Sequence, residues 1–95
     1  MPLTIIIATP QNGAQNVPIF NGVIMTNGTV DQNGTTVSAI LSDGTNGSPA
    51  NEMVNANQQW SFRCGAARNT TYTLTVSGAN GNGNGQSSVT FTTAL

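Results

Sequence analysis

Histidine and lysine are both absent from the 95 residues of this chain, and charge of either sign is scarce. Charged side chains make up 5% of the sequence, against roughly 25% in ordinary soluble domains. A surface with so little charge has almost no long-range field to steer it toward nucleic-acid phosphates or anionic lipids. We therefore expect neither nucleic acid nor a membrane as a partner. The charged residues are Asp31, Asp43, Glu52, Arg63 and Arg68.

The missing histidine also bears on catalysis, because general acid–base chemistry needs a group that titrates near the working pH. The three carboxylates fall in separate segments and form no paired motif. The single cysteine, Cys64, has no histidine, lysine or aspartate beside it to activate the thiol, and it cannot form an internal disulfide. The sequence thus predicts a protein that is not an enzyme and that binds no cofactor.

Long apolar runs are absent as well. No stretch reaches the length of a membrane span, and the first ten residues, MPLTIIIATP, lack the basic and apolar regions of a secretory signal. Two interpretations follow for the location of the protein. Either it is made and assembled in the cytoplasm, or it is one module of a longer exported chain.

Two polar segments have some features of ligand-binding loops, but both are better explained as turns or loops without a ligand. Residues 31–34, Asp-Gln-Asn-Gly, faintly resemble a calcium loop, but calcium takes about six to eight oxygens, usually from several carboxylates. An Asx turn leading into a hairpin is the favoured interpretation. Residues 78–85 are glycine-rich, yet they open no helix and lack the lysine of a phosphate-binding loop. We expect no metal and no nucleotide.

What the sequence does contain is short runs of alternating apolar and polar residues, which predict half-buried strands. Two such runs flank a corner at residues 65–69, and further strands are predicted at residues 3–8, 19–26, 35–42, 50–56 and 87–93. Residues 27–34, 43–49 and 77–86 are rich in Asn-Gly pairs and are predicted as loops. The inward-facing core is predicted to include Trp60, Phe62, Tyr72, Leu74 and Phe91.

About seven short strands with frequent turns predict an all-β fold, an immunoglobulin-like two-sheet Greek-key sandwich. A chain of this length is expected to form one domain over residues 1–95. Because loops at one end of such a sandwich cluster, that end is a candidate recognition site. Its candidate residues are Asn27, Asp31, Asn33, Asn80, Asn82 and Asn84.

Several short motifs follow one another along the chain: Ile5-Ile6-Ile7, Pro10, Gly13, Val17, Asn27-Gly28, Trp60-Ser61-Phe62, Tyr72-Thr73-Leu74-Thr75-Val76 and Ser88-Val89-Thr90-Phe91-Thr92. Their order resembles the bacterial Ig-like modules of surface adhesins and tailed-phage virion proteins. Tyr72 sits where such sandwiches place a tyrosine corner, whereas the cysteine pair of antibody domains is missing and the tryptophan lies on a different strand.

The resemblance implies a structural role, and we expect a capsid decoration protein on the virion surface of a tailed phage. Its partner would be the major capsid protein, bound by many copies, with weak glycan contact in addition. Ile6 and Ile40 are predicted to point outward and are the candidate docking patch.

The alternative is a cell-surface adhesion or carbohydrate-binding module from a longer exported protein. A self-contained module that begins at Met1 and lacks a signal peptide fits the phage case better. For sugar binding, Phe20 is the one aromatic residue that an exposed platform would use. A core position for Phe20 in the second sheet is the favoured interpretation.

Overall fold

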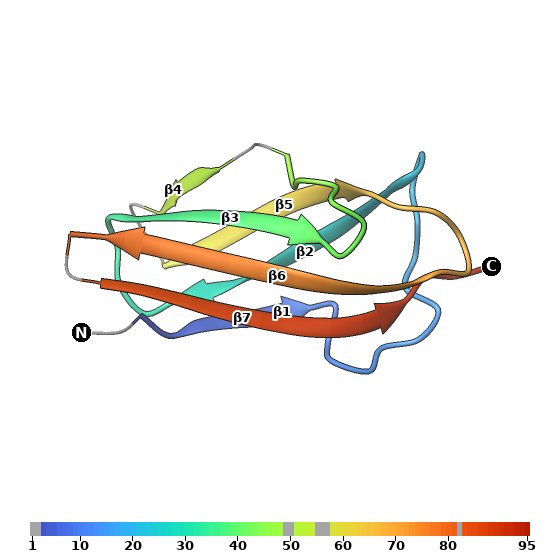
Figure 1. Cartoon of the computed structure of the whole chain (residues 1–95), viewed down its shortest axis with the longest axis horizontal. Coiled ribbons are helices and arrows are strands. Elements are labelled where there is room, and N and C mark those ends of the chain that lie inside the picture. Colours follow the sequence, from blue (N-terminus) through green and yellow to red (C-terminus); the bar gives the residue numbers. More distant parts are fainter. Residues whose placement is uncertain (1–2, 49–50, 55–57, 82) are drawn as a thin grey trace.

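The described residues form seven antiparallel strands in two stacked sheets (Figure 1). The computed structural model describes residues 3–48, 51–54, 58–81 and 83–95, and its extents are 41 × 23 × 22 Å. The strands are β1 (Ile5–Thr9), β2 (Val23–Val30), β3 (Thr35–Leu41), β4 (Glu52–Val54), β5 (Gln59–Gly65), β6 (Thr71–Asn80) and β7 (Gly83–Thr92).

One sheet has three strands in the order β1-β2-β5, and the other has four in the order β4-β3-β6-β7. The predicted immunoglobulin-like sandwich is therefore confirmed. The short β4 pairs with β3 instead of β5, so it differs from the constant-type arrangement. The described residues form no helix, and hence none that is long and apolar enough to cross a membrane.

The core lies between the sheets, where the alternation of β5 and β6 places every second side chain. All five residues of the predicted core are buried, with exposed fractions of 5% or less. Two ring pairs anchor it, Trp60 with Phe62 at 5.8 Å and Tyr72 with Phe91 at 5.9 Å between ring centroids. These separations lie in the range favoured by aromatic pairs.

A tyrosine corner joins the two sheets between β5 and β6. The Tyr72 hydroxyl accepts a hydrogen bond of 2.8 Å from the backbone N–H of Ala67, five residues upstream. At the same corner, the Thr93 hydroxyl donates to the Ala67 carbonyl at 2.7 Å. Both backbone groups of Ala67 are thus held by side chains, which fixes the path of the chain from one sheet to the other.

Replacing Tyr72 with phenylalanine is expected to lower the free energy of unfolding by about 1–2 kcal/mol, because the Ala67 N–H loses its acceptor in a part-buried setting. Urea unfolding followed by tryptophan fluorescence measures this difference. A Tyr72→Phe protein that unfolds at the wild-type urea concentration would show that the corner hydrogen bond adds nothing to stability.

Parts of two segments predicted as loops belong to strands. Residues 77–80 and 83–86 continue the β6–β7 hairpin as far as the Asn80–Gly83 pair. Gly85 serves close packing, since a Cβ there would lie 2.2 Å from the Leu3 carbonyl oxygen. Likewise β2 runs on to Val30 through Gly28, which faces the core. The Asn-Gly pairs in both segments had indicated turns.

The predicted strand at residues 19–26 begins later, because its first part is a turn. Phe20 and Val23 exchange two backbone hydrogen bonds of 2.9 and 3.0 Å around Asn21 and Gly22. The φ angles of Asn21 and Gly22 are 55° and 76°, as in a type I′ turn. The predicted strand at residues 50–56 is β4, which occupies residues 52–54, and residues 50, 55 and 56 lie outside the described part.

One side of the sandwich is closed by hydrogen bonds to the outer edge of β7. Residues 12–17 supply four of these partners, including Val17, whose N–H donates to the Thr92 carbonyl at 3.0 Å. Near the other end of β7, Leu3 donates to the carbonyl of Asn84 at 3.0 Å. Both ends of the β7 edge are therefore occupied, which shortens the free backbone that a partner could use for strand addition there.

Candidate functional site

Each of the three carboxylates holds a backbone N–H group. Hydrogen bonds from the backbone and side chain of Thr45 lower the pKa of the Asp43 carboxyl. Asp31 bonds to the segment before β1 instead of capping its own turn, so the predicted Asx turn is replaced by a long-range contact. The acceptor–donor pairs are Asp31 with Thr4 (3.0 Å), Asp43 with Thr45 (2.9 Å) and Glu52 with Ser61 (3.2 Å).

The described residues offer neither a cluster of metal ligands nor an activated thiol. Among residues 3–48, 51–54, 58–81 and 83–95, no three His, Cys, Asp or Glu side chains gather as metal ligands. Cys64 is fully buried, and burial, followed by the charge of Asp43, raises the pKa of its thiol. A buried thiol kept protonated is a poor nucleophile.

The residues of the predicted recognition loops lie mostly in strands. Only Asp31 and Asn33 lie in a turn, between β2 and β3, whereas Asn27, Asn80 and Asn84 lie in strands. Several of these groups hold neighbouring segments together. The Asn33 side chain accepts a hydrogen bond from the N–H of Gln58 at 3.2 Å, and the Asn80 amide donates to the hydroxyl of Thr35 at 3.0 Å. Asn82 lies outside the described residues.

The predicted docking pair does not form one patch. Ile6 and Ile40 are both exposed, by 57% and 42%, but Ile6 is on β1 of the three-stranded sheet and Ile40 is on β3 of the four-stranded sheet. Exposed side chains of stacked sheets point to opposite sides of a sandwich. The alternation indicated that both residues face outward, but strand order alone did not reveal that they lie on different sheets.

The outer surface of the three-stranded sheet, which we call the β1-β2-β5 face, carries three exposed apolar side chains. Ile6 pairs with Thr29, and Met25, which is 47% exposed, lies further along β2. Phe20, on the turn before β2, is 67% exposed, so the predicted core position for it is wrong. The four-stranded sheet exposes Ile40 and Met53.

An apolar cleft lies at the turn end of the β1-β2-β5 face. Its volume is about 290 Å³. Met25 and Arg63 face each other across β2 and β5, and Phe20 stands beside them on the turn. The sequence analysis did not identify Met25 or Arg63 as site residues. The turn beside them could have been predicted, because an Asn-Gly pair between apolar residues is a strong hairpin signal. The cleft is lined by Phe20, Asn21, Val23, Met25 and Arg63.

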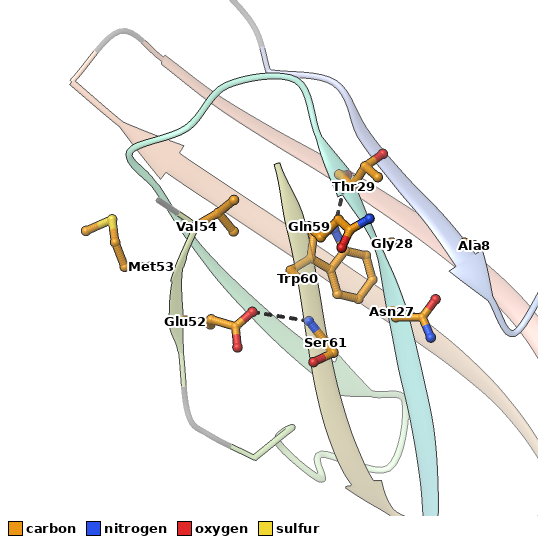
Figure 2. Close-up of a pocket in the computed structure, with 10 residues that line it drawn as sticks. All are labelled: Ala8, Asn27, Gly28, Thr29, Glu52, Met53, Val54, Gln59, Trp60 and Ser61. Carbon is orange, nitrogen blue, oxygen red and sulfur yellow. Dashed lines mark hydrogen bonds between the residues drawn. The ribbon is translucent and has the colours of Figure 1, made fainter. Parts of the chain in front are cut away.

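A larger and more polar groove lies between β4 and the β1-β2-β5 face (Figure 2). Its volume is about 640 Å³. In Figure 2, Glu52 reaches from β4 toward β5 and bonds to Ser61, while the Asn27 side chain stands across the groove. Trp60 forms part of the floor, and its indole N–H donates to the Thr29 carbonyl at 3.0 Å. The groove offers amide, hydroxyl and carboxylate groups over a partly apolar base.

Comparison with known proteins gives one family. The model of a bacterial Ig-like domain matches residues 1–93. Neither the curated proteins nor the solved structures contain a significant match to the chain. Ig-like domains of this kind are typically non-catalytic and fit a surface or adhesion-type module.

Proposed function

The chain belongs to the bacterial Ig-like domain family, and from this membership we propose that it is a non-enzymatic module that docks on a larger assembly. The observation that carries the proposal is the β1-β2-β5 face, where Ile6, Phe20 and Met25 are exposed. Phe20 and Met25 line one cleft on this face, and Ile6 lies further along it, opposite Thr29. Exposed apolar side chains on one surface favour burial against a partner. Because the chain has few charged side chains, few charges would lose their hydration when this face is covered by a partner.

The assembly that we propose is the capsid of a tailed phage, with this protein on its outer surface and the major capsid protein as its partner. Many identical sites on a shell allow a modest single contact to give stable coverage through repeated copies. The hydrogen bonds at both ends of the β7 edge support docking through a sheet face in preference to strand addition at that edge.

Substitution of Met25 by aspartate is expected to reduce association with the assembly at least about tenfold, because a carboxylate would be desolvated at the docking face. The matched control is Ile40→Asp on the opposite sheet, which is exposed to a similar degree and is expected to bind as wild type. Purified protein is added to particles stripped of it, and bound protein is quantified after sedimentation. Loss of binding in Ile40→Asp with retention in Met25→Asp would assign docking to the other face.

A glycan-binding module is the second candidate function, and the groove of Figure 2 favours it. The side chains of Asn27, Gln59 and Glu52 line that groove and are suited to pairs of sugar hydroxyls. Trp60 is only 2% exposed, so it does not offer the open aromatic surface on which a sugar ring would lie. We therefore rank this function below docking.

A further inference from the structure

The apolar cleft at the turn end of the β1-β2-β5 face is preorganised. Phe20 is held by two backbone hydrogen bonds to Val23 across a type I′ turn, so its position is fixed while 67% of the residue stays exposed. Because the turn already fixes the backbone at Phe20, little backbone entropy is lost when a partner covers this side chain. Such an arrangement is suited to binding and contributes little to the core.

Arg63 contributes the one charged side chain among the residues that line this cleft. Its backbone N–H and carbonyl bond to Ser48, on the side away from β2, so Met25 and Arg63 form a non-hydrogen-bonded pair. Side chains approach most closely in such pairs, whose Cα atoms are about 4.5 Å apart. Within the described part of the chain, the Arg63 guanidinium makes no hydrogen bond or ion pair, whereas Arg68 donates to the Leu95 carbonyl at 3.1 Å.

We propose that this cleft is the anchor of the docking face and that it binds an acidic segment of the partner protein, with a carboxylate next to an apolar side chain. The inference rests on the proposed function and names the chemistry of the partner at that site. Phenylalanine, methionine and arginine are enriched at protein interfaces. A guanidinium beside an apolar surface binds a carboxylate through two parallel hydrogen bonds.

The composition of the cleft favours a protein over a saccharide. Only Asn21 and Arg63 bring polar side chains to it, whereas the remaining lining residues are apolar. A neutral sugar would find more hydrogen-bonding groups in the groove of Figure 2, which is lined by Asn27, Glu52 and Gln59. The cleft and the groove therefore differ in the ligand class that each one suits.

The test uses the full chain labelled with ¹⁵N and two blocked dipeptides, acetyl-Leu-Glu-amide and acetyl-Leu-Gln-amide. We expect saturable NMR shifts at Phe20, Met25 and Arg63, with the glutamate peptide binding about tenfold more tightly. In the Arg63→Gln variant we expect equal affinity for the two peptides. The Arg68→Gln variant, which loses the same charge elsewhere, should still bind the glutamate peptide more tightly. Glucuronate and a neutral glucose oligosaccharide are titrated in parallel.

Equal affinity for the two peptides, or a preference that survives in Arg63→Gln, would overturn the proposal. Glucuronate binding more tightly than the glutamate peptide at the same residues would assign the cleft to acidic saccharides instead. Because this titration needs no particle, its result is separate from particle association. Peptide binding without particle association counts against the decoration function alone, and particle association that survives in Arg63→Gln counts against the anchor.

Discussion

Replacing Trp60 with alanine is expected to lower the free energy of unfolding by about 3–5 kcal/mol, the range measured for large aromatic residues removed from cores. Trp60 is 2% exposed, pairs with Phe62, and donates its indole N–H to the carbonyl of Thr29. The substitution therefore opens a cavity and leaves a carbonyl without its donor. A domain of this size is stable by only about 5–15 kcal/mol, so the loss is a large share of the total.

Urea unfolding followed by circular dichroism measures the effect, since the variant lacks the fluorescent reporter. Trp60→Phe is the matched variant, because it keeps an aromatic ring and removes the indole N–H. We expect its destabilisation to be smaller than that of Trp60→Ala. Equal unfolding midpoints for Trp60→Ala and wild type would mean that this residue is not central to the core.

Gly28→Ala is expected to destabilise the fold by about 3 kcal/mol or more, at the upper end of the usual cost of overpacking. A Cβ at this position would lie 1.9 Å from the carbonyl oxygen of Ile6 and 2.6 Å from the Trp60 ring. The first neighbour is backbone of β1, and the second is a buried indole, so neither can move without breaking contacts. We expect the substitution to weaken the pairing of β1 with β2.

The matched control is Gly81→Ala, since a Cβ there would meet nothing within 4 Å. Its effect on the unfolding free energy should stay within about 0.5 kcal/mol. Thermal or urea unfolding compares the two variants directly. If Gly28→Ala were as stable as Gly81→Ala, β1 would not cross β2 as closely as the structure has it.

The core was predictable from the sequence because it depends on local alternation. Trp60 and Phe62 before the corner, and Tyr72 and Leu74 after it, follow the two-residue period of a half-buried strand. The tyrosine corner followed from the position of Tyr72 at the start of its strand. These features require no knowledge of which strands become neighbours.

The Asn-Gly pairs could not be assigned to turns or strands from neighbouring residues alone. Asn21-Gly22 forms a type I′ turn, whereas Asn27-Gly28 lies inside β2, with its glycine against β1 and Trp60. The same dipeptide serves a turn in one place and a close approach of two strands in the other. Only the packing of β1 on β2 distinguishes them, and that packing is a long-range property.

The candidate site depended on the same long-range information. Strand alternation indicates that Ile6 and Ile40 face outward, but the sheet to which each strand belongs decides whether they share a surface. The cleft brings Phe20 and Met25 to Arg63, some forty residues away, through the pairing of β2 with β5. A pattern confined to neighbouring residues does not contain that pairing.

The most direct test of the central claim, that this module decorates a larger assembly, is a density-gradient separation of particles and cell envelopes from the source material. Each fraction is probed by mass spectrometry for peptides of this sequence and for the major shell protein. We predict that the sequence bands with the particles in a fixed ratio to the shell protein. Its presence in envelope fractions alone would contradict the decoration function and favour an adhesion module.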